Sequence, residues 1–353
     1  MAQTLSGPTG TTSGRKVTGV RVPTLEYPSP NQEDNGRQRC LIVFVPGNPG
    51  LIGYYTPFLS TLRELLDEAE SRKGSTKSFH LYGQNLLGFC DADHSPPFSS
   101  STPPFTLEDQ INHFSARLPE LSTLSLASGA AVPFDHILVM GHSVGAYIAV
   151  EVFHRHHLLL AQPPSPSTAP SLNLKTGILL FPAISHIARS PNGRILDRLR
   201  ASPFFNQWAH HIGRALVTPI PRVCLEWICQ VVLRQSHHAS VATAEFLASR
   251  DGIWQALHLG KDEMVSITEN RWSEDLWEHR GPREGNEADK FFFYFGTGDR
   301  WVDEGSRDEF IAARREASGG GGVKVVMDEG GISHAFCIRE YPLFSCKAVG
   351  EFG

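Results

Sequence analysis

The chain has 353 residues, of which 41% are hydrophobic, so it is long enough to bury one large core or two smaller ones. Its net charge of −5 and the absence of any Lys/Arg cluster in the sequence argue against nucleic acid as the main partner. The six cysteines form no CxxC pair, which predicts reduced thiols in a cytosolic setting and not a disulfide framework.

The N-terminal segment is polar and rich in Gly, Thr and Pro. We predict a flexible leader over residues 1–36, with a short strand near Lys16–Val22. The segment has no apolar h-region, so no signal peptide is expected. No uninterrupted apolar run in the sequence reaches the roughly 20 residues that a transmembrane helix needs, so no membrane span is expected.

Beyond the leader, short apolar runs alternate with amphipathic segments. The runs predict buried strands at 41–45, 79–82, 137–140, 177–181, 291–295 and 323–327. Helical periodicity predicts helices at 58–70, 106–118, 144–157 and 306–317, the second opened by a capping box from Thr106 to Asp109. This alternation predicts an α/β fold, with a mostly parallel sheet covered by helices on both faces.

Residues 184–286 interrupt the alternation, because their patterns are mainly helical and contain no clear strand. We interpret them as a helical cap inserted into one α/β domain. The core of that domain is then formed by residues 37–183 and 287–353. A Pro- and Ser-rich stretch at 162–171 predicts an irregular loop within the core.

The sequence ILVMGHSVG, residues 137–145, reads as a strand, a G-x-S-x-G motif and the start of a helix. A nucleophile elbow requires this context, since its serine sits in a strained turn between a strand and a helix. We therefore predict Ser143 as a nucleophile. The alternative is a glycine-rich turn with an incidental serine.

The general base and the acid follow from chain order, which in α/β-hydrolases is Ser, then Asp or Glu, then His. His334 is the only histidine after the last predicted strand, and we predict it as the base. Asp299 follows the 291–295 strand through a short glycine-containing turn, which suits the carboxylate that orients the base. Asp303 is the rival, although its place ahead of a helix is typical of a cap.

Two other histidines, His94 and His142, could lie near the same pocket. We interpret His142 as a packing or hydrogen-bonding neighbour of the serine and not as the base.

The oxyanion donors are sought in the loop PGNPG, residues 46–50, which follows the first buried strand. One donor should be the N–H of Val144, directly after the nucleophile, and the other an N–H of this loop. Pro46 and Pro49 have no N–H, so we predict Asn48, with Gly47 providing the turn. Asn48→Pro should then harm turnover far more than Asn48→Ala. A phosphate cradle is disfavoured because neither GxxxxGK[ST] nor GxGxxG follows this strand.

These motifs, with several longer segments, resemble one known family. The segments are VPGNPGLIGYYTPFLSTL, GHSVGAYIAVEVF, LLFPAISHIARSPNGRIL, YFGTGDRWV and SHAFC, spread from about residue 40 to 340. They resemble the lipid droplet-associated hydrolases, α/β-hydrolases linked to neutral lipid. The resemblance implies that Ser143, Asp299 and His334 are the catalytic residues. It also implies a lipid ester substrate, such as a sterol ester or acylglycerol, and residence at lipid droplets or the cytosolic side of the endoplasmic reticulum.

The segment 222–234 bears on lipid contact independently. As a helix it would carry one narrow polar stripe, while the rest of its surface is apolar. Such a helix is either buried in the cap or laid on an apolar surface. The side chains available for membrane or substrate contact are Leu225, Trp227, Ile228, Val231 and Val232. Phe204, Phe205 and Trp208 could extend the same apolar patch.

From the sequence we predict a serine ester hydrolase that acts on lipid esters through an acyl-enzyme. No metal or cofactor is expected, since no ligand cluster has zinc spacing. The expected partners are a lipid ester and a droplet or membrane surface. Two alternatives stay open, a droplet surface protein with a hydrolase fold and little turnover, and an acyltransferase that uses the same residues.

Overall fold

The computed structural model describes residues 11–17, 20–34, 36–125, 131–161, 172–277, 290–317 and 322–339. The loop predicted at 162–171 and the tail beyond residue 339 lie outside these ranges. Side chains are described from Val22 onward.

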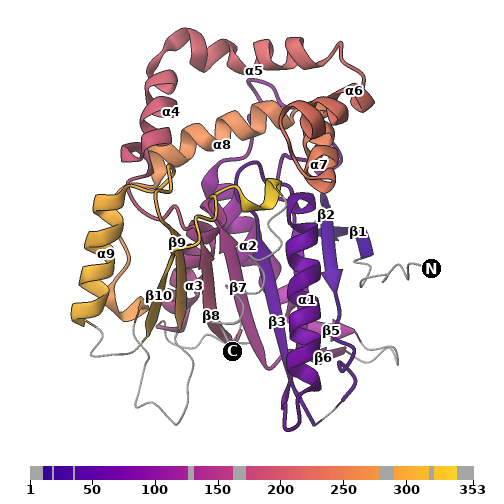
Figure 1. Cartoon of the computed structure of the whole chain (residues 1–353), viewed down its shortest axis with the longest axis vertical. Helices are drawn as coiled ribbons and strands as arrows, with labels where there is room; N and C mark the ends of the chain where they lie inside the picture. The colour runs from indigo at the N-terminus through magenta and orange to yellow at the C-terminus, as the bar shows by residue number, and fades with distance from the viewer. Residues whose placement is uncertain are drawn as a thin grey trace.

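An eight-stranded sheet runs through the molecule in the order β1-β2-β4-β3-β7-β8-β9-β10 (Figure 1). The pairs from β4 to β10 are parallel, whereas β1 pairs with β2 and β2 with β4 antiparallel. The strands are β1 (Thr11–Val17), β2 (Val20–Tyr27), β3 (Gln38–Val45), β4 (Lys77–Gln84), β7 (His136–His142), β8 (Leu174–Leu180), β9 (Phe291–Gly296) and β10 (Val323–Asp328). A separate two-stranded sheet joins β5 (Thr123–Ser125) to β6 (Ala131–Pro133). Each strand predicted from an apolar run is present.

Helices cover both faces of the large sheet, as predicted. They are α1 (Thr56–Ser71), α2 (Leu107–Leu121), α3 (Val144–Leu160) and α9 (Glu304–Ala317). Figure 1 shows α1 in front of the strands and α2 and α3 behind them. The side chains of Phe291 and Phe293 project from the same face of β9 and contact Phe153 of α3 and Phe310 of α9, so α9 shares the face of α3.

The capping box predicted at the start of the second helix is confirmed. The Thr106 hydroxyl accepts from the Asp109 N–H, and the Asp109 carboxylate accepts from the Thr106 N–H. The box satisfies two N–H groups that the first turn of α2 would otherwise leave without partners.

The prediction of a flexible leader over 1–36 was wrong for residues 20–27, while the short strand predicted near Lys16–Val22 falls across the end of β1 and the start of β2. Residues 20–27 form β2, which pairs with β4 and buries Val22, Leu25 and Tyr27. The averaged polar composition concealed the apolar residues of this strand. Pro23 has no N–H to offer, and its carbonyl accepts from the Asn85 N–H.

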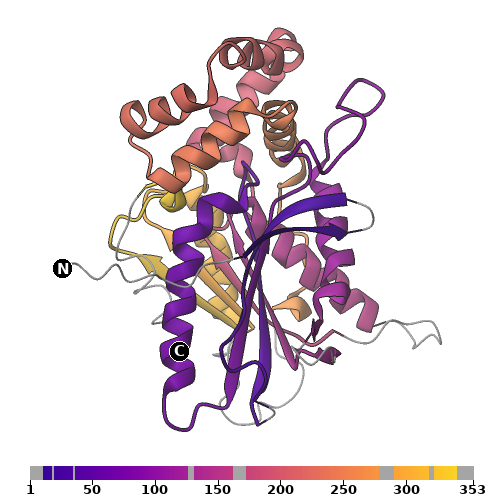
Figure 2. The same cartoon turned by 90° about the vertical axis from the view of Figure 1, so that its right-hand side faces the viewer.

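The segment predicted as a cap lies beyond the carboxyl ends of the parallel strands, at one end of the sheet in both views (Figures 1 and 2). Its helices are α4 (Pro191–Ala201), α5 (Pro203–Val217), α6 (Arg222–Trp227), α7 (His237–Ala248) and α8 (Gly252–Ser266). Over its described part, which ends at residue 277, every regular element is helical. The mainly helical character predicted for 184–286 agrees with this.

The segment predicted as a helix over 222–234 is helical from Arg222 to Val232. The α-helix α6 continues after Trp227 into a π-helical turn, Ile228–Val232, and the segment ends before Arg234, which has a φ of 54°. The wider π turn shifts side chains around the axis, so the narrow polar stripe predicted for a regular helix is interrupted there.

Candidate active site

Ser143 lies in a sharp turn between β7 and α3. Its φ of 56° and ψ of −122° are unusual for a residue with a side chain, as expected of a nucleophile elbow. The turn requires close approach of α3 to the end of β3, since a Cβ on Gly145 would lie 2.2 Å from the Val45 carbonyl oxygen. The Ser143 N–H donates to the Leu180 carbonyl at 3.0 Å, which ties the turn to β8.

His334 brings its imidazole to this serine from the loop after β10. Its Nε2 is 2.9 Å from Ser143 Oγ, and its Nδ1 is 2.7 Å from Asp299 Oδ2. A carboxylate can only accept, so Nδ1 carries the proton and Nε2 is free to accept from the serine hydroxyl. Asp299 is fixed in turn by the Trp301 N–H, which donates to Oδ1 at 2.9 Å.

The other candidates occupy different positions. Asp303 accepts from the Ser306 N–H at 3.1 Å and hydroxyl at 2.7 Å, the arrangement of a cap at the start of α9. His94 lies between the carboxylates of Asp93 and Asp251, at 2.6 and 2.9 Å. It is not among the residues that line the pocket at Ser143. The structure therefore brings together Ser143, His334 and Asp299 of the predicted set.

The PGNPG loop lies directly against the elbow. A Cβ on Gly47 would be 3.0 Å from Ser143 Cβ and from His142 Nδ1, which is why this position is bare. The Gly47 N–H donates to the Tyr55 hydroxyl at 3.0 Å. Within the described chain, neither the Asn48 N–H nor the Val144 N–H at the start of α3 has a recorded acceptor. Asn48 lines the pocket at Ser143, and Val144 follows the serine directly at the start of α3.

His142 connects this loop to the histidine loop. Its Nδ1 is 2.7 Å from Tyr55 Oη, and its Nε2 is 2.9 Å from the His334 carbonyl oxygen. Burial, with the nearby His334, holds the pKa of His142 well below its usual range, so the ring is neutral. Nε2–H must then donate to the carbonyl, and Nδ1 accepts from the Tyr55 hydroxyl.

Tyr55 thus accepts from Gly47 and donates to His142, and burial raises its pKa well above the usual range. Sequence reasoning placed His142 as a neighbour of the serine but missed Tyr55. The only signal was the Tyr-Tyr pair after PGNPG.

A cavity of about 210 Å³ opens at Ser143, between the core and the cap. The core contributes Asn48, Pro49, Tyr54, Tyr55, His142, Ser143, Trp301, His334, Ala335, Cys337 and Ile338. The cap region contributes Ile187, Leu196, Gly260 and Glu263. This wall of aromatic and aliphatic groups suits an apolar ligand with one polar centre. Burial raises the pKa of the Cys337 thiol to about 12, so that thiol stays protonated.

Glu263 is a residue of the pocket that sequence reasoning missed. Its Oε1 accepts from Asn48 Nδ2 at 3.0 Å, and the same nitrogen donates to the Ala256 carbonyl at 3.0 Å. The Asn48 side chain therefore anchors its loop to α8. This contradicts the expectation that only the backbone of Asn48 matters, because truncation to Ala would release the anchor.

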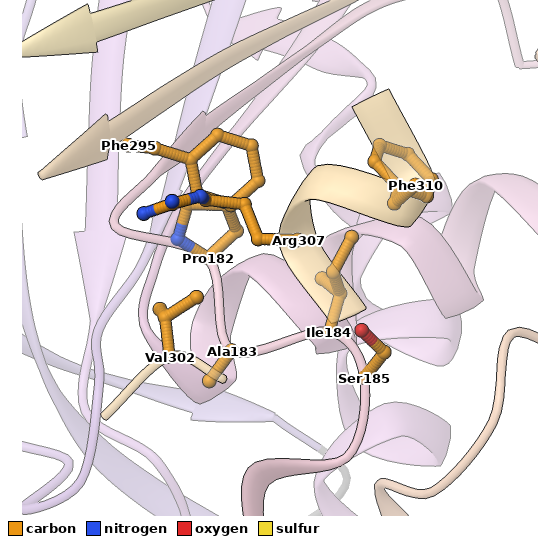
Figure 3. A pocket seen from close by; sticks show the side chains of 8 residues that line it. All are labelled: Pro182, Ala183, Ile184, Ser185, Phe295, Val302, Arg307 and Phe310. Carbon is orange, nitrogen blue, oxygen red and sulfur yellow. The ribbon is translucent and has the colours of Figure 1, made fainter. Parts of the chain in front are cut away.

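A second, much smaller void lies between the 182–185 loop, the end of β9 and α9 (Figure 3). It measures about 10 Å³, room for a single water molecule, so it cannot hold a substrate. Its lining is Pro182, Ala183, Ile184, Ser185, Phe295, Val302, Arg307 and Phe310. Among the residues that the structure describes, no group of three or more His, Cys, Asp or Glu side chains is placed to hold a metal ion.

Comparison with known families gives a match over residues 38–337 to the model of the lipid-droplet associated hydrolases. The chain belongs to this family. Among curated members, it is 27% identical over 315 residues to the lipid droplet-associated hydrolase of Rattus norvegicus, covering 86% of this chain and 81% of that one. The Drosophila melanogaster member is 22% identical over 320 residues, with 87% of each chain covered.

Solved structures share the architecture at low sequence identity. Juvenile hormone epoxide hydrolase from Bombyx mori has a TM-score of 0.52 and 11% identity, covering 96% of this chain and 75% of that one. The peroxisomal α/β-hydrolase Lpx1 of Saccharomyces cerevisiae has a TM-score of 0.53 and 10% identity, covering 94% and 81%. The α/β-hydrolase fold predicted from the sequence is confirmed.

Proposed function

We propose that the protein is a serine hydrolase of lipid esters. One observation carries the proposal, the hydrogen-bonded chain from Ser143 Oγ through the His334 ring to the Asp299 carboxylate, at 2.9 and 2.7 Å. This is the arrangement that lets a histidine take a serine proton while a carboxylate orients its ring. Membership of the hydrolase family supports the same reading.

In the proposed reaction, His334 Nε2 takes the proton of Ser143 as Oγ attacks the ester carbonyl. Asp299 holds the ring and stabilises its charged form. The oxyanion accepts from the N–H groups of Asn48 and Val144. The protonated His334 gives its proton to the leaving alcohol, and an acyl-enzyme remains on Ser143. Water, activated by the same histidine, then releases the fatty acid.

A lipid ester is the proposed substrate class because the pocket walls are mainly apolar. The name shared by the curated relatives points in the same direction. Sterol esters and acylglycerols are the two candidates. The alternatives are acyl transfer to an alcohol, and a droplet surface role with little turnover.

The decisive experiment compares wild type with Ser143→Ala by fluorophosphonate labelling and against a panel of sterol esters and acylglycerols. We expect labelling and turnover in wild type alone, with equal melting temperatures showing that both proteins are folded. Labelling that survives in Ser143→Ala would disprove the assignment of the nucleophile. An added alcohol acceptor tests acyl transfer, which would appear as a new ester in place of free acid. Droplet phenotypes that persist in Ser143→Ala would favour the surface role.

We further propose that the cap rests on a lipid surface through α5, whose polarity is inverted relative to a normal surface helix. Its outward stripe is apolar and more than two fifths exposed at each position, comprising Phe204, Trp208, Ile212 and Leu216. Its inward contacts are polar or aromatic. Asn206 accepts from Lys261 of α8, Arg214 donates to the Arg250 carbonyl, and His210 stacks on Trp254. Exposure of such an apolar outer face to water is unfavourable, whereas its burial at the boundary of a lipid layer is favourable.

The segment after α5 extends this surface in part. Trp227, Val231 and Val232 are 58%, 54% and 62% exposed, as lipid contact requires. Ile228 is half-buried, and Leu225 is 3% exposed and packs inside the cap, so Leu225 cannot meet lipid. Among the described residues, no single helix is long and apolar enough to cross a membrane. Helices 203–217 and 222–232 meet that test only as a pair bent by 102°.

Flotation with triacylglycerol droplets coated by a phospholipid monolayer tests the surface. We expect Trp208→Glu combined with Leu216→Glu to lose droplet binding. Leu159→Glu is the matched control, since Leu159 is 60% exposed but lies at the end of α3, outside the cap. Binding that survives the double change would show that α5 does not contact lipid.

A further inference from the structure

Glu263 is a buried carboxyl group in the pocket wall, and the proposed mechanism does not use it. It lies on α8, is 5% exposed, and receives a hydrogen bond from the side-chain amide of Asn48. Within the described residues, no ion pair joins it to a lysine or arginine. Burying a carboxyl group without a cation is costly, so its position calls for an explanation.

Among the residues that the structure describes, the hydrogen bonds of the Asn48 side chain all go to α8. Its Nδ2 donates to the Ala256 carbonyl and to Glu263 Oε1, each at 3.0 Å, whereas its Oδ1 is buried without a partner in the described chain. Between these two contacts, Gly260 leaves room for the amide, because a Cβ there would stand 3.4 Å from Nδ2. One helix of the cap thus supplies a carbonyl, a bare glycine and a carboxyl group to a single side chain.

We propose that Glu263 is a positioning residue for ester hydrolysis: from α8 it holds the Asn48 side chain, so that the Asn48 backbone N–H stays aimed at the oxyanion. The inference rests on the proposed function. It assigns the cap a part in the alignment of the oxyanion hole, in addition to covering the pocket. The contact joins residues 215 positions apart, so the loop and the cap must keep their relative placement for the donor to stay aligned.

The charge state of Glu263 matters because it shares the pocket with the reacting centre. Burial raises its pKa to about 8, the Asn48 hydrogen bond opposes this, and the neighbouring Asp262 reinforces it. The other titratable groups that line the pocket all belong to the core, namely Tyr54, Tyr55, His142, His334 and Cys337. Burial raises the pKa of both tyrosines and of the thiol, so these three stay protonated. Lys261 is turned away, toward Asn206 of α5. Glu263 is therefore an uncharged acid at neutral pH and becomes an anion beside the oxyanion as the pH rises through about 8.

The test uses the full chain and p-nitrophenyl butyrate, a soluble ester that needs no lipid surface. We compare Glu263→Leu, Glu263→Gln and Val265→Gln between pH 6 and 10. At pH 7 the Leu variant should lose about 10- to 100-fold in kcat with little change in KM, because a misaligned oxyanion donor acts on the transition state. The Gln variant keeps an acceptor for Asn48 and should recover most of that loss. Val265→Gln, an exposed position on the same helix, should behave as wild type.

The pH profile separates positioning from a purely structural role. The kcat of wild type should fall as the pH rises through about 8, whereas Glu263→Gln cannot ionise and should lack this fall. A folded Glu263→Leu with unchanged kcat would overturn the inference. So would a Gln variant that keeps the alkaline fall of wild type.

If Glu263→Leu does not fold, Asn48→Ala takes its place, since it removes the amide but keeps the backbone N–H. Its loss in kcat should not increase when Glu263→Ala is added, because both changes remove the same contact. Fully additive losses would overturn the inference. Ser143→Ala is measured alongside. If activity persists in Ser143→Ala, both the proposed function and this inference are wrong. If activity depends on Ser143 but does not change when Glu263 is substituted, only the inference is wrong.

Discussion

The side chain of His142 is hydrogen bonded to the backbone carbonyl of His334, with Nε2 2.9 Å from that oxygen. The residue before the predicted nucleophile thereby holds the loop of the predicted base. Through Tyr55 the same ring also reaches the Gly47 N–H. One neutral imidazole therefore fixes the two loops that face each other across Ser143.

Tyr55→Phe tests this connection. The change leaves the Gly47 N–H without its acceptor and His142 Nδ1 without its donor, both in a buried setting. We expect a loss of about 2 kcal/mol in the free energy of unfolding and about a 10-fold loss in kcat, because unsatisfied buried groups cost stability and loosen the oxyanion loop. Urea unfolding and ester kinetics measure the two effects. Tyr27→Phe is the control, since that hydroxyl makes only a 3.5 Å contact with the Thr56 carbonyl.

Gly47→Ala should reduce turnover without preventing folding. The added methyl group would lie 3.0 Å from His142 Nδ1 and Ser143 Cβ, so the loop must shift by a few tenths of an ångström. We expect about a 10-fold fall in kcat, since alignment at the reacting centre is sensitive to small displacements. Gly305→Ala is the matched control on α9, where the nearest atom would be 3.7 Å away. Equal kinetics for the two variants would show that the PGNPG loop tolerates a side chain.

Substitution of Asp299 should mainly affect activity, whereas substitution of Asp303 should mainly affect stability. Asp299→Asn is expected to lower kcat by about 10⁴ with small effect on folding, because an amide stabilises the wrong tautomer of His334. Asp303→Ala removes the cap of α9 and should cost about 1 kcal/mol in stability while keeping turnover. Paired kinetics and thermal melts measure this. The reverse pattern would make Asp303 the functional acid.

Stability should fall on acidification, partly because of His113. This ring accepts a hydrogen bond from Gln84 at 2.7 Å, and burial followed by the nearby Arg117 lowers its pKa to about 4. The unfolded chain protonates it near pH 6.5, so between these values the unfolded state holds the extra proton and acid favours it.

Urea unfolding measures the free energy of unfolding at pH 7.5 and at pH 5.0. Between these two pH values, His113→Gln should lose less of this free energy than wild type. His237→Gln, at an exposed side chain, is the control. An identical loss in all three proteins would rule out His113 as a contributor.

Several features could be predicted because they depend on short stretches of the sequence. Apolar runs marked the buried strands, and the chain order of Ser143, Asp299 and His334 pointed to three residues that the fold does bring together. Tyr55 and Glu263 could not be predicted in the same way. Glu263 lies 215 residues from Asn48, in a helix whose pattern gives no sign of which face meets the loop.

The two structural errors have distinct causes. The strand β2 was anticipated only at its first residues, by the strand placed near Lys16–Val22, because composition was averaged over 36 residues, although Val22, Leu25 and Tyr27 are buried. The helix predicted over 222–234 is present as far as Val232, but its regularity was overestimated because a constant period of 3.6 residues was assumed. Sequence periodicity carries no warning of a π turn after Trp227.

The place of β2 has a practical consequence for anyone who shortens the chain. Residues 24–27 pair with β4 and close that side of the parallel sheet. A protein that starts at residue 37 would leave the β4 edge open to water, and an open edge is a template for pairing with another copy. Size-exclusion chromatography should then show soluble aggregates for the shortened protein. Removal of residues 1–10 alone should give no aggregates, and the protein should elute at nearly the same volume as the full chain.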